Sequence, residues 1–313
     1  MTKMKKYNVT ALGEILIDMA PMGRDDSGDN MFVSKAGGAP VTFLATVAKY
    51  GGRAAFIGKV GDDMFGAHLR EVVKNAGIDD RNLITDKVHN TTLAFVSLDD
   101  KGDRSFSFYR SFNADTFLSK DDVDTELIKN SDIFHFGSLS LTSECCEEAT
   151  AYALRTARES GCVITYDPNY RPALWESEAA AIEKIMKYIG YADILKVSRE
   201  EAEMLSGKTT TEEAERFFLG LGISLVLITD AENGAYFATA SGRGHAPSAD
   251  VSAVDTTGAG DIFFGSFIHK FISSGKALDE LNIGDIAEFA AFAANNAGKS
   301  TLKKGGLPSI PEI

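Results

Sequence analysis

Residues 255–261 read DTTGAGD, and the apolar residues of 262–271 follow them at the spacing of a buried helix. The small residues Gly258, Ala259 and Gly260 are therefore expected in the first turn of that helix. Backbone N–H groups in a first helical turn lack partners within the helix, and the helix dipole is positive there. The stretch predicts a binding place for a phosphate, whose oxygens can approach closely where side chains are small.

Asp261 ends this stretch, within reach of whatever the bound phosphate faces. The helix dipole stabilises a carboxylate at this position, and such a carboxylate can accept the proton of a hydroxyl group. Taken alone, the stretch also fits a tight loop with one favourable charge in a first helical turn. The remainder of the chain has to decide between these two interpretations.

Upstream of this stretch, short apolar segments alternate with amphipathic helices. This alternation favours a parallel sheet with right-handed crossovers, and therefore an α/β fold. Ligands of such sheets bind beyond the carboxyl ends of the strands, so the turn at residues 167–171 (DPNYR) is expected to line a site. Strands are predicted at residues 9–18, 54–58, 133–136, 163–166, 193–197 and 225–229.

A different pattern lies between residues 91 and 110. Two short segments, 91–96 and 105–109, flank the turn DDKGD at residues 99–103, which indicates a β-hairpin. Phe106 and Phe108 share one face of the second segment, as expected of a strand with one covered face. A small sheet apart from the main one would serve as a lid. No linker rich in Pro, Gly or Ser is present, so residues 1–313 are expected to form a single domain.

The composition is that of a soluble globular protein, with 44% hydrophobic and 25% charged residues. A formal net charge of -13 would repel a phosphate backbone, so nucleic acid is not expected as a partner. No apolar run approaches the roughly 20 residues that cross a membrane, so no membrane partner is expected either. Cys145, Cys146 and Cys162 lack metal-ligand spacing, which favours a reducing, cytoplasmic location.

Further segments accompany residues 255–261 along nearly the whole chain. They are Gly13 and Glu14 with Asp18, 37–40 (GGAP), 61–63 (GDD) with 65–66 (FG), 106–110 (FSFYR) with 114–115 (AD), 167–171 (DPNYR) with Trp175, and 304–306 (KGG). Together they resemble the ribokinase-like, or pfkB, family of carbohydrate kinases, and its fructokinases most closely. The resemblance implies a three-layer sandwich in which helices flank a mainly parallel sheet. It also implies a small β-sheet lid, formed by segments near 12–18, 31–36 and 91–110.

The resemblance further implies an enzyme that transfers the terminal phosphoryl group of ATP to a sugar hydroxyl. Asp261 would be the catalytic base, and Gly258, Ala259 and Gly260 would stabilise charge on the transferred group. Thr42 stands where relatives usually have Asn, and its hydroxyl has a shorter reach. Arg110 and Arg171 also fit ordinary salt bridges. The implied sugar-contacting residues are Asp18, Gly37, Gly38, Thr42, Arg110, Asn169 and Arg171.

For ATP and the cofactors Mg²⁺ and potassium, the resemblance implies a second group of residues. Glu201 would orient Mg²⁺-bound water, although Ser198 with Glu201 also has the spacing of a helix capping box. Asp255, with the carbonyl groups of residues 300–305, resembles the family's monovalent-cation site. The helix that contains Asn295 would border the adenine, although its Ala and Phe residues also fit a plain core helix. The implied ATP contacts are Ser198, Thr229, Gly234, Gly258, Gly260 and Asn295.

Fructose, converted to fructose 6-phosphate, is the acceptor that the resemblance favours. The alternative is 2-keto-3-deoxygluconate, because Arg110 and Arg171 could clamp its carboxylate, and ribose or nucleosides are other acceptors of the family. A sugar or nucleotide sensor on the same fold is a non-enzymatic alternative, against which the retained Asp261 argues. A nicotinamide dehydrogenase is disfavoured, because its Gly-rich turn would follow the first strand.

The hairpin at residues 91–110 is expected to close over the sugar and to exclude water, which would otherwise accept the phosphoryl group. Its apolar side, with Phe106 or Phe108, is expected to meet a second subunit and form a homodimer. The small sheet therefore carries two predictions, one about catalysis and one about assembly.

Overall fold

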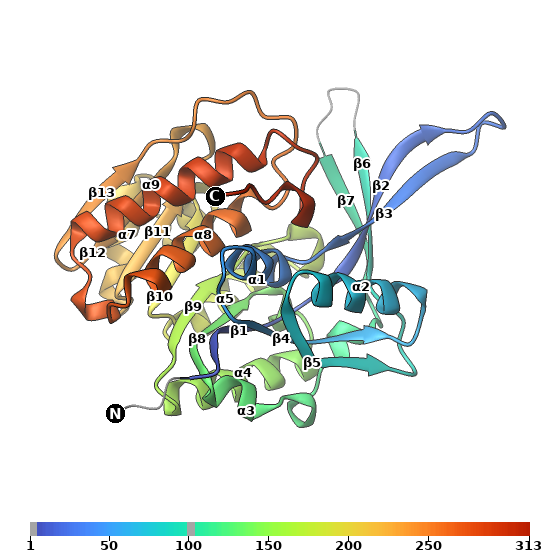
Figure 1. Ribbon diagram of the computed structural model, residues 1–313, viewed down its shortest axis with the longest axis horizontal. Helices are drawn as coiled ribbons and strands as arrows, with labels where there is room; N and C mark the ends of the chain where they lie inside the picture. The colour runs from blue at the N-terminus through green and yellow to red at the C-terminus, as the bar shows by residue number, and fades with distance from the viewer. Residues whose placement is uncertain (1–4, 99–103) are drawn as a thin grey trace.

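A computed structural model describes residues 5–98 and 104–313 (Figure 1). The predicted turn at residues 99–103 and the side chain of Phe106 lie outside the described part. The main sheet consists of β1 (Tyr7–Leu12), β4 (Ala54–Gly61), β5 (Ile78–Asp86), β8 (Ser131–Gly137), β9 (Val163–Asp167), β10 (Ile194–Ser198), β11 (Leu225–Thr229), β12 (Ala235–Thr239) and β13 (Gly242–Ala246). These nine strands have the order β13-β12-β11-β10-β9-β8-β1-β4-β5. Only the β11–β12 and β12–β13 pairs are antiparallel, so the predicted, mainly parallel sheet is confirmed.

Helices cover both faces of this sheet, each over its own apolar core, which confirms the three-layer α/β fold. Phe43, Phe264 and Phe267 lie in the core of one face, and Phe136 stacks on Tyr166 in the core of the other at a centroid distance of 4.0 Å. One face carries α1 (Ala39–Lys49), α2 (Met64–Asn75), α8 (Ala259–Ser274) and α9 (Ile283–Ser300). The other carries α3 (Thr125–Lys129), α4 (Glu144–Glu159), α5 (Glu178–Ile189), α6 (Arg199–Ser206) and α7 (Thr211–Gly220).

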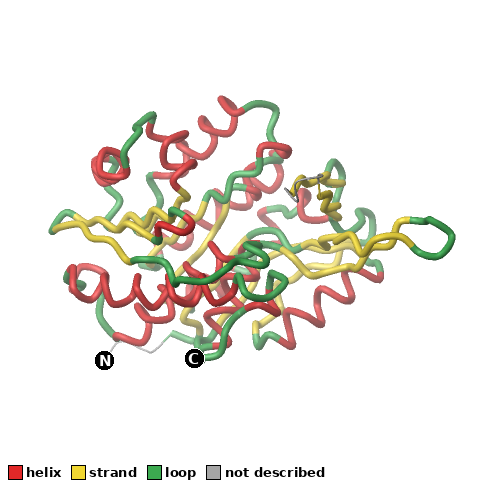
Figure 2. Tube along the Cα trace, turned by 90° about the horizontal axis from the view of Figure 1, so that it is seen from above, coloured by secondary structure: helices red, strands yellow, loops and turns green. Residues whose placement is uncertain are grey.

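The second sheet is small and lies to one side of the main body. Its strands are β2 (Leu16–Arg24), β3 (Asn30–Gly37), β6 (Leu93–Leu98) and β7 (Arg104–Tyr109), in the order β3-β2-β6-β7. Figure 2 shows the β2–β3 arm extending away from the helices. The predicted small sheet is confirmed, and we call these four strands the small sheet below. Among the described residues, no helix has the length and apolar character that a membrane crossing requires.

The prediction of a single first strand at residues 9–18 is wrong. The chain leaves the main sheet at Leu12 and enters the small sheet at Leu16. A Cβ at Gly13 would lie 2.6 Å from Pro40 Cγ, so the connection passes close to the start of α1. The apolar pattern continues through both strands, which hides the break. β5, β12 and β13 were not predicted, because charged or small residues interrupt their apolar pattern.

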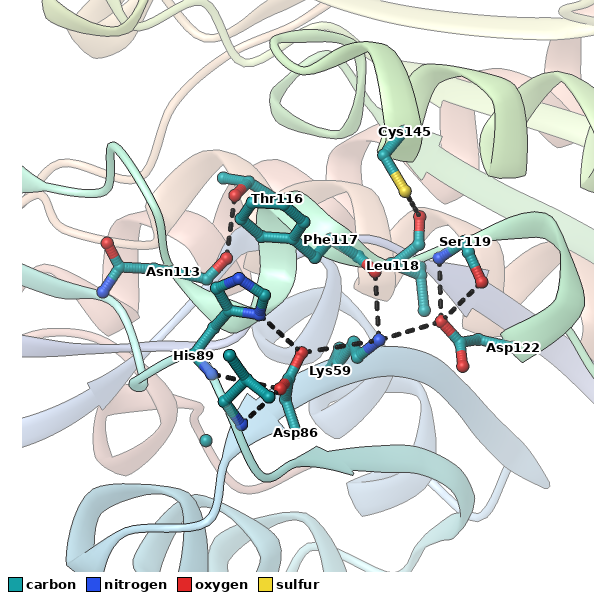
Figure 3. A network of polar contacts seen from close by, with 12 residues as sticks. Lys59, Asp86, His89, Asn113, Thr116, Phe117, Leu118, Ser119, Asp122 and Cys145 are labelled. Atoms are coloured by element: carbon teal, nitrogen blue, oxygen red, sulfur yellow. Dashed lines mark hydrogen bonds and ion pairs between the residues drawn. The ribbon is translucent and has the colours of Figure 1, made fainter.

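A polar network ties both ends of the β6–β7 hairpin to the main sheet (Figure 3). Lys59 on β4 donates to the carbonyl oxygen of Phe117 at 3.0 Å, and its ammonium lies 3.0 Å from Asp122 and 3.5 Å from Asp86. Phe117 follows β7 in the short helix η1 (Ala114–Phe117), and its ring stacks on His89, which precedes β6, at 3.8 Å. The segments that enter and leave the hairpin are therefore both anchored.

Candidate active site

The candidate site lies at the carboxyl ends of the central strands. The chain starts in the middle of the main sheet at β1, adds β4 and β5 on one side, and later adds β8 to β11 on the other. Such a reversal of strand order leaves a crevice at the carboxyl edge of a parallel sheet. Glu14 follows β1, Leu139 follows β8 and Asn169 follows β9, and all three line one cavity.

The start of α8 forms a wall of this cavity. Gly258 is the N-cap residue with φ of 78°, a left-handed conformation that glycine adopts without strain, and it offers no capping side chain. Ala259 and Gly260 follow as the first residues of the helix. The structure thus places an uncapped helix start beside a cavity, as the predicted phosphate site requires.

Three cavities meet along this wall. The first lies between the small sheet and Asp261, and Phe108 of β7 is among its lining residues. The second is lined by Lys196 and Thr256, and it shares Asn169, Arg171 and Asp261 with the first. The third, of about 280 Å³, shares Thr256 and Gly260 with the second and reaches α9. A row of cavities therefore runs from the small sheet, past Asp261, to α9.

Asp261 occupies the junction of the first two cavities, in the first turn of α8. Asn169 Nδ2 donates to its Oδ1 at 3.3 Å, which orients the carboxyl group. Burial raises the pKa of Asp261 to about 8; the charge of Asp167 also raises it, whereas Lys196 and Arg171 lower it. A carboxyl group with a pKa near neutrality is suited to take up a proton and release it again.

All the predicted sugar-contacting residues except Arg110 line the first cavity. Arg171 forms no ion pair with any residue that the structure describes, and its NH1 donates to the carbonyl of Tyr170 at 3.1 Å. Thr42 Oγ1 donates to the carbonyl of Gly38 at 3.1 Å, so its oxygen can only accept from a ligand. The residues brought together as predicted are Asp18, Gly37, Gly38, Thr42, Asn169 and Arg171.

Arg110 is placed differently from the prediction, in a buried ion pair that does not line the cavities. Its Nε donates to Asp115 Oδ2 at 2.6 Å, and its NH1 donates to Thr142 Oγ1 at 2.6 Å. Its NH2 donates to the carbonyl oxygen of Leu139 at 3.0 Å. The structure favours the salt-bridge interpretation of Arg110, which supports the cavity through the backbone of Leu139.

The third cavity contains some of the residues predicted for ATP. Thr229, Gly234 and Gly260 line it, whereas Ser198 and Gly258 do not. Asn295 is exposed on α9 and does not line this cavity, although Ala294, Ala297 and Gly298 of the same helix do. The helix therefore lies beside the cavity as predicted, but the residues of α9 that line the cavity do not include Asn295.

Ser198 and Glu201 form the capping box at the start of α6. Glu201 Oε2 accepts from the backbone N–H of Ser198 at 2.8 Å, and its Oε1 accepts from that of Tyr170 at 2.6 Å. Burial raises the pKa of Glu201, and the nearby charge of Asp167 raises it further. Among the described residues, no group of three or more His, Cys, Asp or Glu side chains could hold a metal. A metal bound here would therefore take most of its ligands from substrate and water.

Asp255 is buried between two loops, as the predicted cation site requires. Its carboxylate accepts from the backbone N–H of Thr257 at 2.9 Å and from that of Gly305 at 2.8 Å. The backbone N–H of Asp255 donates to the carbonyl of Thr301 at 3.0 Å. The loop at residues 255–258 and the chain after α9 are thereby joined beside Gly258.

Two charged residues of the site, Lys196 and Glu14, were not predicted. Lys196, on β10, lines the second cavity and lies 2.9 Å from Asp167, which ends β9 in the turn that was expected to line a site. Glu14 lines the first cavity, and burial raises its pKa to about 7. A lysine within the apolar strand at residues 193–197 was the sequence signal that could have identified Lys196.

Comparisons with known proteins agree with this geometry. Residues 6–313 match the family described as pfkB family carbohydrate kinase. The probable fructokinase-5 of Arabidopsis thaliana is 39% identical over 309 residues, which cover 97% of this chain and 94% of that protein. The fructokinase of Xylella fastidiosa with bound ATP has a TM-score of 0.89 at 29% identity, with 97% of this chain and 95% of that chain covered. A double mutant of the Vibrio cholerae O395 fructokinase, with fructose, ADP and potassium ion bound, has a TM-score of 0.88 at 28% identity, with coverage of 99% and 96%.

The α/β fold, the small sheet and the helix start beside a carboxylate define a carbohydrate kinase of the ribokinase-like type. The match extends over nearly the whole chain, and no large part of the relatives is left uncovered. The chain belongs to the pfkB family of carbohydrate kinases.

Proposed function

We propose that this chain is a fructokinase, which transfers the terminal phosphoryl group of ATP to the 6-hydroxyl group of fructose. The observation that carries the proposal is the position of Asp261 beside the start of α8, between the first cavity and the cavities that lead to α9. Similarity to fructokinases over 97% of the chain supports fructose as the acceptor. The fructose and ADP bound to the Vibrio cholerae protein support the same pair of ligands.

Fructose would bind in the first cavity. The Asp18 carboxylate can accept hydrogen bonds from two sugar hydroxyls. A Cβ at Gly37 would lie 2.3 Å from Asp18 Oδ2, so glycine leaves the room that this carboxylate needs. Asn169 and Arg171 would donate to sugar oxygens from the opposite side of the site. Phe108 would cover the sugar, and closure of the small sheet would exclude water from the transfer.

ATP would bind with its base in the third cavity and its phosphates towards the second. The third cavity is largely apolar, with Val251, Phe263 and Ala294 among its lining residues, which suits a purine ring. Gly234 has φ of 90°, and a Cβ there would lie 2.2 Å from the carbonyl oxygen of Ala246. Only glycine therefore allows the close backbone approach at this edge of the cavity.

Two metal ions belong to the proposal. Mg²⁺ would bind mainly to phosphate oxygens and water, with Glu201 orienting its bound water, and it would neutralise phosphate charge. Potassium would bind near Asp255 and carbonyl oxygens of residues 300–305. The joined loops support this second site, since they bring a buried carboxylate to a turn of the backbone.

The reaction would proceed by direct transfer. Asp261 would take the proton of the acceptor hydroxyl group. At the same time the hydroxyl oxygen would bond to the terminal phosphorus of ATP, and the bond from that phosphorus to the bridging oxygen would break. Asn169 would hold Asp261 in position. Backbone N–H groups at Gly258, Ala259 and Gly260 would stabilise the charge on the transferred group without reorganisation.

The small sheet would also form a homodimer. Met22, Phe32 and Val33 on β2 and β3, and Tyr109 on β7, are large apolar side chains with exposed surface. Phe95 makes edge contacts with Phe32 at 5.3 Å and with Tyr109 at 5.2 Å, so the aromatic residues form one surface. An exposed apolar surface of this kind is typical of an interface. The free thiols of all three cysteines support a reducing, cytoplasmic location.

Replacement of Asp261 by Asn tests the proposal, because the amide keeps the shape and cannot take up the proton. We expect kcat to fall by about 10²- to 10⁴-fold while fructose and ATP still bind, as measured by calorimetry. Near-normal turnover of the variant would refute the mechanism. A panel of sugars tests the acceptor: preference for 2-keto-3-deoxygluconate would replace fructose, and sugar binding without turnover in the unmodified protein would indicate a sensor.

A further inference from the structure

We propose that Lys196, held by Asp167, is a positioning residue that favours the ionised form of the Asp261 carboxyl group, the form that accepts the proton of the sugar hydroxyl. The inference rests on the proposed function of Asp261 as the base. It assigns a role in the reaction to two residues that belong to the strands of the main sheet rather than to the loops around the cavities.

Lys196 is a buried charge in a strand that is otherwise apolar. Ile194, Leu195 and Val197 are fully buried, and Lys196 is 5% exposed. Its ammonium donates to Asp167 Oδ2 at 2.9 Å, across the parallel β9–β10 pair. Burial of a charge is costly unless the charge is paired, and a buried ion pair seldom stabilises a protein more than apolar residues of the same size would. Stability alone therefore does not account for this pair.

The pair is also incompletely hydrogen-bonded. Asp167 Oδ1 is buried and has no hydrogen-bond partner among the described residues. Among the described residues, the Lys196 ammonium likewise has a single hydrogen-bond partner, which is Asp167. Buried polar atoms ordinarily have hydrogen-bond partners, and an exception calls for an explanation, of which a catalytic role or a bound ion or water is one.

The ammonium lies against the first turn of α8. A Cβ at Gly260 would come 2.8 Å from Lys196 Nζ, so glycine at this position leaves the room that the ammonium occupies. Lys196 lines the second cavity together with Gly258, Gly260 and Asp261. The charge is thus placed next to the base and beside the backbone N–H groups that would receive the phosphoryl group.

Charges on several elements act on Asp261, and they oppose one another. Asp167 and Glu14 raise its pKa, and Lys196 and Arg171 lower it. His135, on β8, adds no charge, because burial and the nearby Lys196 lower its pKa to about 3. Glu201 acts on Lys196 and raises its pKa together with Asp167, so the ammonium remains charged. Without Lys196, two carboxyl groups and burial would hold the proton on Asp261 more tightly.

The pH profile of kcat/KM for fructose tests this role in the intact protein. In Lys196→Gln, we expect the midpoint of the rise in activity with pH to move up by about one unit or more. In Asp167→Asn, the midpoint moves down, and in the double variant it returns towards that of the wild type, because the two charges are removed together. Lys196→Arg retains the charge and is expected to keep the midpoint near that of the wild type.

Lys270→Gln is the matched control, because it removes the same charge from the far end of α8, where Lys270 pairs with Glu288 at 2.7 Å. It is expected to leave the profile unchanged. If Lys196→Gln does not fold, Asp167→Asn alone decides, since it retains the ammonium. A loss of activity with unmoved midpoints in the folded variants would overturn the inference. Failure of the base assignment is distinguishable, because Asp261→Asn would then remain active.

Discussion

Two buried ion pairs differ in how completely they are satisfied. Arg110 and Asp115, which follow β7, are completely hydrogen-bonded. Each guanidinium nitrogen has an acceptor, and Asp115 Oδ1 accepts from Thr92 Oγ1 at 2.5 Å. Lys196 and Asp167 share one hydrogen bond and leave a carboxylate oxygen without a partner in the described structure. The complete pair holds the fold together, and the incomplete pair adjoins the cavity where chemistry is expected.

The largest effect on stability is expected when the complete pair is broken. Arg110→Met removes three hydrogen bonds and leaves Asp115 as an uncompensated buried charge. We expect the free energy of unfolding to fall by about 3–5 kcal/mol, measured by urea denaturation. Arg171→Met is the matched control, because Arg171 has no ion pair among the described residues, and it should raise KM for fructose with little change in stability. Unchanged stability with a raised KM in Arg110→Met would restore the sugar-contacting role.

The next effect concerns Glu14, which interacts electrostatically with the Arg110–Asp115 pair and with Asp261. Arg110 and Asp115 influence its pKa, and Glu14 in turn raises the pKa of Asp261. Burial raises the pKa of Glu14 from 4.5 to about 7, so the folded protein binds this proton more tightly than the unfolded chain. The contribution of Glu14 to stability is therefore lost as the pH rises through this window.

Urea denaturation of the wild type and Glu14→Gln at pH 5 and pH 8 measures this contribution. We expect the wild type to lose stability relative to the variant between these pH values, by on the order of 3 kcal/mol. The difference is taken between the two proteins, so other titrating groups largely cancel. A difference that is the same at both pH values would show that Glu14 is ionised throughout.

The sequence could predict features that depend on residues close together along the chain. The predicted phosphate site at residues 255–261 is local, because its glycines and its aspartate lie together at one helix start. The parallel strands follow from runs of apolar residues, which need no knowledge of the partner strand. Asn295 is exposed beside residues that line the third cavity, because a shift of one residue turns a helical side chain by about 100°.

Residues that meet only through the fold could not be predicted in this way. Arg110 finds Asp115 five positions away but Thr142 thirty-two positions away, and these contacts remove it from the cavity. Lys196 and Asp167 are twenty-nine positions apart, and neither carries a motif that names the other. The register of β9 and β10 brings them together.

Lys59 also forms partly buried ion pairs, and its replacement is expected to have an intermediate effect on the free energy of unfolding. Its ammonium has the carbonyl of Phe117 and the carboxylates of Asp122 and Asp86 as partners, so it resembles Arg110 rather than Lys196. Lys59→Met should lower the free energy of unfolding by about 2 kcal/mol, because charged hydrogen bonds are lost at a partly buried site. The pH profile of kcat/KM should keep its midpoint. A moved midpoint would mean that complete hydrogen bonding does not separate structural charges from those that act on the reaction.

An exposed ion pair is expected to contribute least to the free energy of unfolding. Arg216 contacts Glu212 one helical turn away on α7, and the Arg216 side chain is 73% exposed. Water screens such a pair, and holding two long side chains in one geometry costs conformational entropy. Arg216→Gln should therefore change the free energy of unfolding by at most about 0.5 kcal/mol in urea denaturation. Arg216 has a close carboxylate partner, as Lys59 does, and differs from Lys59 in being exposed. A fall in the free energy of unfolding as large as that of Lys59→Met would therefore show that burial does not determine how much these pairs contribute to stability.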